Sequence, residues 1–387
     1  MNVLIASDNK IFLVKGNYFA SNSFQKVISR YKKYFGNIVI CTRVILCNDD
    51  ASIPNSFVNI NDITTEVFSI NSLLNVFFGK CDALLKRLIL SNDLCIARLP
   101  TITGMRISKL AKKLDVKYLV EVVGCAWDAY WNHGFIGKLF AVFGYLMMKK
   151  CVKNASFATY VTTVFLQKRY PCTCPSINCS NVLIDNTDIS ILERRLQKNK
   201  SINKKRIVLF TAAAIDVSYK GQRYVIESIP YLKKMGYIIE YRMAGVGDKK
   251  HLEKVAKKCN ALNSILFLGA LSREDVIKEL DNSDIYIQPS LQEGLPRSVI
   301  EAMSRGCLVL GANTAGIPEL INKECIFKKA SSKAIANSII RLIDSFDYDK
   351  YSVSNFENSK NYESGVLEKR RQGFYDSIMK DIAGTGC

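Results

Sequence analysis

Two glutamates stand eight positions apart in the segment SLQEGLPRSVIEAMSRG, residues 290–306. Glu293 follows a short apolar run, and Glu301 falls in the second turn of a helix that should begin near Pro296 and end at Gly306. A helix N-terminus offers free backbone N–H groups to a phosphate, and acids beyond it can accept hydrogen bonds from hydroxyls. A ligand that fits such a site has phosphates with a polyol on each side, as a sugar nucleotide does.

A simpler interpretation is that the acids only favour a helix start on a solvated face, which stabilises a helix by about 0.3 to 1 kcal/mol. That interpretation explains Glu293 less well, because Glu293 precedes the helix. Lys220, in YKG, stands directly before a glycine, so by itself it is typical of an ordinary turn residue.

These segments resemble the retaining glycosyltransferase family 4, which has the GT-B fold. The glutamate-x7-glutamate motif, the lysine-glycine element and the glycine-x-glycine element of AGVGD carry the resemblance, which covers most of residues 206–322. It implies that Glu293 contacts the donor sugar, Glu301 the donor ribose and Lys220 the diphosphate. A cation aimed at a departing diphosphate stabilises the transition state more than the ground state, which agrees with this role for Lys220. The donor-binding residues that it further implies are Gly294, Leu295, Arg297 and Gly245.

The resemblance implies an enzyme, a glycosyltransferase of the hexosyltransferase type. It would move a sugar with retention from a nucleotide-sugar donor to a glycan or lipid-linked acceptor, in bacterial-type surface polysaccharide synthesis. No cofactor and no essential metal are expected. The motif Asp347-Tyr348-Asp349 matches a metal-binding pattern of another fold, but its polar setting suggests a solvated loop.

One position departs from the family pattern. An arginine usually stands six residues before the lysine as a second diphosphate clamp, and here that position is Ala214. Arg297 or Arg223 could take its place, or the chain could be a largely non-catalytic member of the family.

The first half of the chain offers weaker candidates. The segment EVVGCAWDAYWNHG contains Trp127, Asp128, Trp131 and His133, which could stack on or hydrogen-bond a sugar, or could simply pack the domain. Gly16 could let the backbone approach the diphosphate beside a helix that begins near Ser23, or could be a plain turn.

Alternating strand and helix patterns must position these residues. Continuous Val- and Ile-rich runs at 2–6, 37–42, 93–99 and 117–124, and again at 207–213, 238–245, 264–270, 284–290 and 307–313, predict buried parallel strands. The expected fold is α/β, with two doubly wound, Rossmann-like domains that face each other across a cleft.

We place an N-terminal acceptor-side domain at residues 1–195 and a donor domain at 196–362. The polar segment 193–206 is the candidate linker, and residues 363–387 should form a helix that packs back on the N-terminal domain.

The composition bounds the possible partners. With 54 Lys+Arg against 35 Asp+Glu the chain carries +19, which attracts polyanions. Residues 1–185 contribute 22 basic and 11 acidic side chains, or +11. A nucleic-acid-binding protein is therefore one alternative to a glycosyltransferase, but no motif supports it, and we expect no nucleic acid partner.

A second alternative to a glycosyltransferase is a sugar-nucleotide epimerase or another enzyme with the GT-B fold.

Thirteen scattered cysteines suggest free thiols in a reducing cytoplasm. No apolar run is long enough to cross a bilayer. The segments 73–90 and 137–154 mix large apolar residues with lysines, so they could lie on an anionic membrane or form buried helices with lysines at their edges. We therefore expect a cytoplasmic protein with peripheral contact to the inner face of the plasma membrane.

Overall fold

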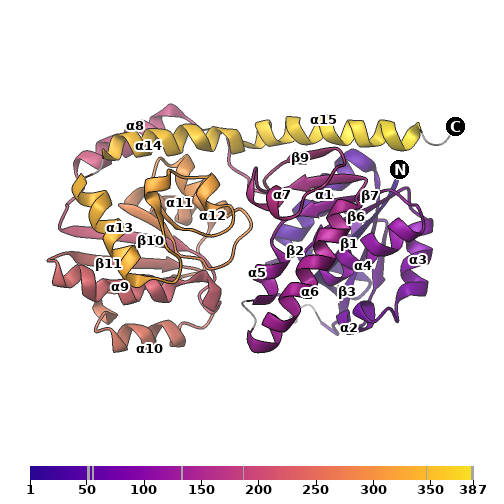
Figure 1. Ribbon diagram of the computed structural model, residues 1–387, viewed down its shortest axis with the longest axis horizontal. Helices are drawn as coiled ribbons and strands as arrows, with labels where there is room; N and C mark the ends of the chain where they lie inside the picture. Colours follow the sequence, from indigo (N-terminus) through magenta and orange to yellow (C-terminus); the bar gives the residue numbers. More distant parts are fainter. Residues whose placement is uncertain (50–52, 55, 132–133, 186, 346, 385–387) are drawn as a thin grey trace. The chain divides into compact units, whose positions relative to one another are not determined.

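A computed structural model describes the chain except residues 50–52, 55, 132–133, 186, 346 and 385–387 (Figure 1). The chain divides into two compact units. The first unit contains Met1–Val161, Leu166–Cys179 and the chain from Lys369 onward, and the second contains Thr162–Phe165 and Ser180–Glu368. Within the part of the chain that the structure describes, every helix is either too short or too polar to span a bilayer.

The first unit is built on a mixed sheet with the strand order β4-β2-β1-β6-β7-β8-β9, and with β3 pairing both β1 and β5. Its strands are β1 (Asn2–Val14), β2 (Asn17–Ser21), β3 (Asn37–Leu46), β4 (Phe57–Asn59), β5 (Glu66–Ser69), β6 (Leu94–Leu99), β7 (Tyr118–Val122), β8 (Phe157–Tyr160) and β9 (Ser176–Asn178). Only the pairs of β2 with β1 and with β4 are antiparallel among the strand pairs of the described residues.

Helices cover this sheet because their apolar faces match its buried strands. They are α1 (Asn22–Phe35), α2 (Leu73–Phe77), α3 (Asp82–Leu90), α4 (Ile102–Lys113), α5 (Ala126–Trp131), α6 (Gly134–Lys153) and α7 (Phe165–Arg169). On α1, for example, Phe24, Val27, Ile28, Tyr31 and Phe35 follow helical spacing and are buried.

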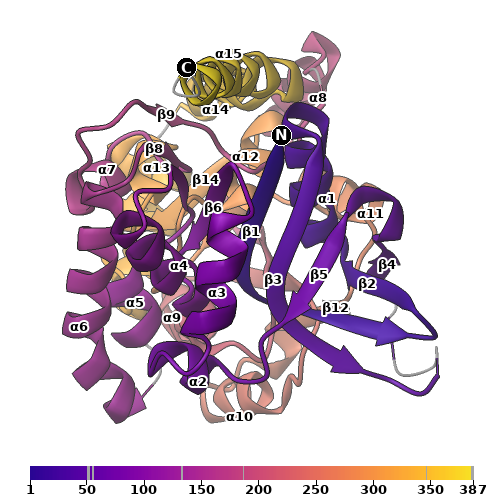
Figure 2. The ribbon, with the colours of Figure 1, turned by 90° about the vertical axis from the view of Figure 1, so that its right-hand side faces the viewer.

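The first strand is longer than the sequence predicts. It continues past residue 6 through an irregularity near residues 7–9, and its second half pairs with β2 and β3, which lie beside it in Figure 2. Gly16 (φ +82°) and Lys15 (φ +48°) form the tight turn between β1 and β2. The turn interpretation of Gly16 therefore describes its place in the fold. A contact between Gly16 and the donor stays a prediction.

The second unit contains a parallel sheet with the order β12-β11-β10-β13-β14-β15. Its strands are β10 (Arg206–Ala212), β11 (Ile238–Ala244), β12 (Ile265–Gly269), β13 (Ile285–Gln288), β14 (Leu308–Ala312) and β15 (Ile326–Phe327). The helices are α8 (Ile189–Lys200), α9 (Gln222–Lys234), α10 (Lys250–Lys258), α11 (Arg273–Asn282), α12 (Arg297–Ser304), α13 (Ser332–Ser345) and α14 (Tyr348–Ser359).

The final helix, α15 (Ser364–Ala383), starts in the second unit and continues into the first. In the first unit its Tyr375 packs against three aromatic rings of α1, at 5.8 Å from the ring of Tyr31, 5.0 Å from Tyr34 and 5.1 Å from Phe35. The C-terminal segment therefore completes the core of the first unit.

The segment expected to be a linker is mostly a helix. Residues 189–200 form α8, and the whole of 180–195, which we placed in the N-terminal domain, belongs to the second unit. The sequence prediction missed this helix because its buried face includes polar residues such as Arg195 and Asn199. Asn199 donates to the Asp349 carboxylate at 3.0 Å, so that carboxylate also lies in a helix packing contact rather than in a solvated loop.

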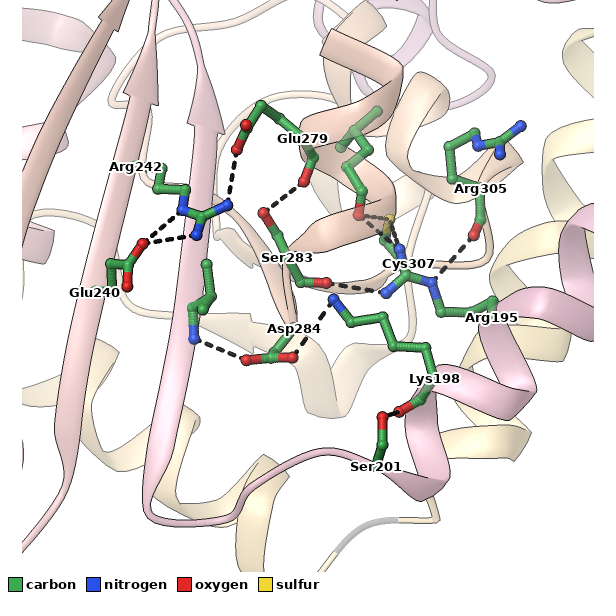
Figure 3. Close-up of polar contacts among 12 residues, drawn as sticks. Arg195, Lys198, Ser201, Glu240, Arg242, Glu279, Ser283, Asp284, Arg305 and Cys307 are labelled. Carbon is green, nitrogen blue, oxygen red and sulfur yellow. Dashed lines mark hydrogen bonds and ion pairs between the residues drawn. The ribbon is translucent and has the colours of Figure 1, made fainter. Parts of the chain in front are cut away.

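Arg195 anchors α8 in the second unit (Figure 3). Its guanidinium is almost fully buried and donates to the carbonyl oxygens of Leu280 at 2.6 Å, Ser283 at 2.9 Å and Arg305 at 3.3 Å. It also contacts the Cys307 sulfur at 3.0 Å. These carbonyls lie at or just beyond the C-terminal ends of α11 and α12, where helix carbonyls lack partners within the helix. One arginine thus ties α8 to both helices.

Replacing Arg195 by leucine should destabilise the second unit strongly. Each buried carbonyl left without a donor costs about 1 to 3 kcal/mol, so we expect a loss of at least about 3 kcal/mol in the free energy of unfolding, measured by urea denaturation. Arg194→Leu is the matched control, because Arg194 is exposed on the same helix. The hydrogen bond that the structure describes for its side chain goes to the hydroxyl of Ser190, one turn away on α8. Equal stability of the two variants would contradict the anchoring role of Arg195.

Candidate active site

The second sheet reverses its strand order between β10 and β13. Successive strands run outward in one direction from β10 to β12 and in the other from β13 to β15. Open α/β sheets bind ligands at such a switch point, beyond the carboxyl ends of the strands. Lys220 lies in the loop that follows β10 and Glu293 in the loop that follows β13, so both predicted residues lie at this place.

Lys220 and Glu293 form an ion pair. The Lys220 ammonium lies 2.7 Å from Oε1 of Glu293, and both side chains are mostly shielded from water, with 23% and 11% of their surface exposed. The Gln288 amide donates to the same carboxylate oxygen at 3.1 Å. Gln288 is itself held, because its amide also donates to Ser290 and its oxygen accepts from Tyr286 at 2.7 Å. The Glu293 carboxylate is therefore positioned from two sides.

The two loops that carry this pair touch through their backbones. Gly221, with φ +78°, lies so close to Pro289 that a Cβ at this position would stand 2.1 Å from the Pro289 carbonyl oxygen. The Leu291 N–H donates to the Tyr219 carbonyl at 2.7 Å. Only glycine permits this contact, which sets the separation of Lys220 and Glu293.

A third loop, which follows β14, supports the segment after Glu293. The Gly316 N–H donates to the Gly294 carbonyl at 3.0 Å, and a Cβ on Gly316 would stand 2.7 Å from that oxygen. Leu295 packs beside Gly316 and is nearly buried. Gly294 and Leu295 therefore hold the entry to α12, and Arg297, the first residue of that helix, is exposed.

Hydrogen bonds hold the loop that carries Ala214, although this loop lacks the arginine of the family pattern. The buried Gln222 amide donates to the Ala214 carbonyl at 2.9 Å, and Ile215 N–H donates to Val246 at 2.8 Å. A Cβ on Gly245 would stand 2.0 Å from the Ala213 carbonyl oxygen, so Gly245 packs against this loop. Arg223, one candidate substitute for the arginine, forms an ion pair with Glu227 on α9 at 3.2 Å.

Glu301 lies in the second turn of α12 and lines a cavity of about 350 Å³ within the second unit. The cavity lies between α11, α12 and the segment that leads into α8, and its lining includes Leu271, Arg273, Val276 and Ile277. Burial raises the pKa of the Glu301 carboxyl above its ordinary value, while the positive charges of Arg297 and Arg273 lower it. The cavity thus combines an apolar wall with one shielded acid.

The remaining predicted site residues belong to the first unit. On α5 the indole rings of Trp127 and Trp131 stack with centroids 5.2 Å apart, and the Arg169 guanidinium lies 5.9 Å from the centroid of the Trp127 ring. Asp128 lies in the first turn of the same helix. His133 lies outside the described residues. The roles of Trp127, Asp128 and His133 toward a sugar stay predictions.

Sequence reasoning missed two side chains of the site. Gln288, which positions Glu293, could have been noticed as a polar residue that ends the apolar strand IYIQ. Arg273 gave no such signal, because it is one of many basic residues, and its place beside the cavity depends on packing. It forms an ion pair with Asp185 at 3.0 Å. Among the residues that the structure describes, no three His, Cys, Asp or Glu side chains gather as a metal site would require.

Comparison with known proteins places these features in context. Residues 193–357 match the family model described as glycosyl transferases group 1. Protein CapJ of Staphylococcus aureus is 33% identical over 373 residues, which cover 95% of this chain and 92% of CapJ. An N,N'-diacetylbacillosaminyl-diphospho-undecaprenol alpha-1,3-N-acetylgalactosaminyltransferase of Campylobacter jejuni is 29% identical over 192 residues, 48% of each chain.

The fold also matches a solved structure. Anabaena HepE in complex with UDP superposes with a TM-score of 0.65, at 14% sequence identity, over 97% of this chain and 99% of HepE. At this identity the likeness shows the fold alone, which is GT-B as the sequence predicts.

Substituting Gly221 by alanine should destabilise the second unit and disorganise the site. The new Cβ would meet the Pro289 carbonyl in a left-handed backbone conformation, so we expect a loss of about 3 kcal/mol or more in the free energy of unfolding. Gly236→Ala is the matched control, because Gly236 has a similar φ of +82° but open space around its Cβ position. It should lose only about 1 kcal/mol. Equal losses in urea denaturation would show that the contact with Pro289 does not matter.

Proposed function

Since the chain belongs to the group 1 glycosyl transferases, we propose that it transfers a sugar, with retention of the anomeric configuration, from a nucleotide-sugar donor to a glycan or lipid-linked saccharide. The observation that carries this proposal is the Lys220–Glu293 pair at the switch point of the sheet. It supplies a cation and an acid, side by side, where a donor with a diphosphate and a sugar would bind.

Lys220 is the group that stabilises the leaving diphosphate. As the bond between the anomeric carbon and the phosphate oxygen breaks, its electron pair stays on the diphosphate, and a nearby ammonium lowers the energy of that charge. A lysine ammonium has three N–H donors, and one of them reaches Glu293, so two remain for phosphate oxygens. The free N–H groups at the start of α12 add a second positive element.

Glu293 is the group that holds the donor sugar. Both hydrogen bonds described for its carboxylate, from Lys220 and from Gln288, go to Oε1. Oε2 can therefore accept a hydrogen bond from a sugar hydroxyl without loss of either contact. Because Gln288 is buried and both its amide nitrogen and its amide oxygen are hydrogen-bonded, the Glu293 carboxylate needs little reorganisation when the donor binds.

Glu301 is the group that holds the ribose, with the nucleobase in the neighbouring cavity. A ribose has two vicinal hydroxyls, and a carboxylate can accept from both. The cavity volume of about 350 Å³ lies within the range of small-molecule sites, and Leu271, Val276 and Ile277 offer an apolar wall to a base. The departing phosphate accepts the proton of the acceptor hydroxyl in this scheme, so no separate base is required.

The proposed acceptor is a lipid-linked saccharide, which a relative of this chain supports. The Campylobacter transferase is named for a sugar carried on diphospho-undecaprenol, which supports a lipid-linked saccharide in bacterial surface polysaccharide synthesis. Trp127 and Asp128 of the first unit are the residues that we assign to the acceptor or the donor sugar, because stacked indoles offer a flat apolar face to a sugar ring.

A screen of sugar nucleotides by thermal shift tests the donor. A donor at 100 times its dissociation constant stabilises the folded state by about 2.7 kcal/mol, which gives a clear rise in Tm. Release of nucleoside diphosphate that requires an acceptor would support transfer. Release without any acceptor, or a change in the donor sugar alone, would instead indicate hydrolysis or epimerisation.

Glu293→Gln should abolish transfer and spare nucleotide binding. The amide keeps the size of the side chain but loses the charge that pairs with Lys220, so we expect kcat to fall about 100- to 1000-fold. The Kd for the free nucleoside diphosphate should change little. Glu274→Gln, on the exposed side of α11, is the control. Unchanged turnover in Glu293→Gln would remove the sugar contact from the proposal.

Glu301→Ala should act mainly on donor affinity. Loss of hydrogen bonds from hydroxyls to a charged acceptor weakens binding about 10- to 100-fold, measured as the Kd for the donor by calorimetry, while kcat at saturating donor changes less. Glu274→Ala is the control, since Glu274 is exposed in the first turn of α11. Normal donor affinity combined with lost turnover would show that the two glutamates have the opposite roles.

A further inference from the structure

An apolar stripe runs along the outer face of α6. Leu139, Val142, Phe143 and Leu146 follow the i, i+3, i+4, i+7 spacing of one helix face, and each has about half or more of its surface exposed, from 49% for Phe143 to 67% for Leu139. The opposite face of the helix carries the buried residues Ala141, Met148, Cys151 and Val152. The helix is thus apolar on both faces, and only one face is needed by the core.

The stripe continues onto α2. The ring of Phe77 meets the ring of Phe143 edge to face, with centroids 5.8 Å apart. Leu74 and Phe78, at either end of α2, are 67% and 70% exposed. We call Leu74, Phe78, Leu139, Val142, Phe143 and Leu146 together the outer patch. Figure 2 shows α6 along the left edge of the first unit, with α2 near the lower end of α6.

Lysines border the outer patch. Lys138 lies 5.4 Å from the centroid of the half-exposed Trp131 ring, and Lys149, Lys150 and Lys153 are exposed in the last turns of α6. The segment 134–153 contains no Asp or Glu. A tryptophan and several lysines around large apolar side chains are typical of a surface at the boundary between water and lipid.

We propose that the outer patch is a docking surface for an anionic lipid bilayer. The apolar side chains would enter the headgroup region while the lysines contact acidic lipid headgroups. A second copy of the chain is a poorer occupant, because two such patches would bring like charges together with no acid in α6 to pair with them. Nucleic acid would match the lysines but not the apolar centre. This inference goes beyond the proposed reaction and does not depend on it.

Flotation of the full chain with vesicles tests the proposal. Binding should be strong to vesicles of phosphatidylglycerol and phosphatidylcholine, weak to phosphatidylcholine alone, and weaker as salt rises. Equal binding to both vesicle types, or none to the acidic ones, would overturn the proposal.

Two pairs of variants locate the surface. Lys149→Gln with Lys150→Gln should lower the partition coefficient for acidic vesicles about 30-fold, whereas Lys257→Gln with Lys258→Gln, another exposed pair in the last turn of a helix, α10, should leave it unchanged. Phe143→Ser should lower it by about tenfold or more, and Met235→Ser, at a residue of the second unit that is 60% exposed, should not. Equal effects within either pair would overturn the assignment.

Two further measurements separate this proposal from its rivals. The Tm of Phe143→Ser without ligand should lie close to that of the unaltered chain, which shows that the variant is folded and that any loss of vesicle binding comes from the altered surface. Light scattering of the unaltered chain without vesicles should give the mass of a monomer, or a mass that Phe143→Ser does not change. A dimer that Phe143→Ser dissociates would identify the outer patch as an interface between copies and overturn the membrane assignment.

Discussion

The close approach of two loops at the switch point of the second sheet is the constraint on which the site depends. Gly221 lies against the Pro289 carbonyl because it has no Cβ, and the two loops are then joined by the bond from Leu291 to Tyr219. This contact brings a lysine from one loop to a glutamate on the other. A larger residue at position 221 would push the two loops apart and weaken the ion pair, whose two atoms now lie 2.7 Å apart.

Rigid supports surround this contact, and they come from opposite ends of the sheet. At the carboxyl end, Gln288 fixes the Glu293 carboxylate and Gln222 fixes the loop that carries Ala214. At the other end, Arg195 satisfies carbonyls where α11 and α12 finish. The loop with Ala214 in place of the arginine is therefore held by hydrogen bonds of its own backbone. In the proposed reaction, Lys220 and the α12 N-terminus carry the charge of the diphosphate.

Several features were predictable because they depend on local patterns. Val- and Ile-rich runs marked the parallel strands, and Pro296 and Gly306 marked the limits of α12, so the places of Glu293 and Glu301 followed from spacing. Other features were not predictable. The long β1 and its hairpin depend on pairing with β3, and α8 hides a buried arginine within a highly charged segment that resembles a linker. Local polarity misleads wherever a charged side chain finds its partners in distant segments.

The sequence by itself determined the α/β class, the family resemblance and the residue types at the site, because these depend on periodicity and on motifs within a few turns of chain. Only the tertiary structure decided which polar groups meet. Gln288 supports Glu293, Arg195 joins α8 to α11 and α12, and Phe77 joins α2 to α6 beside an exposed apolar face. Contacts between segments far apart in sequence depend on how strands and helices pack, and periodicity within one segment does not specify that packing.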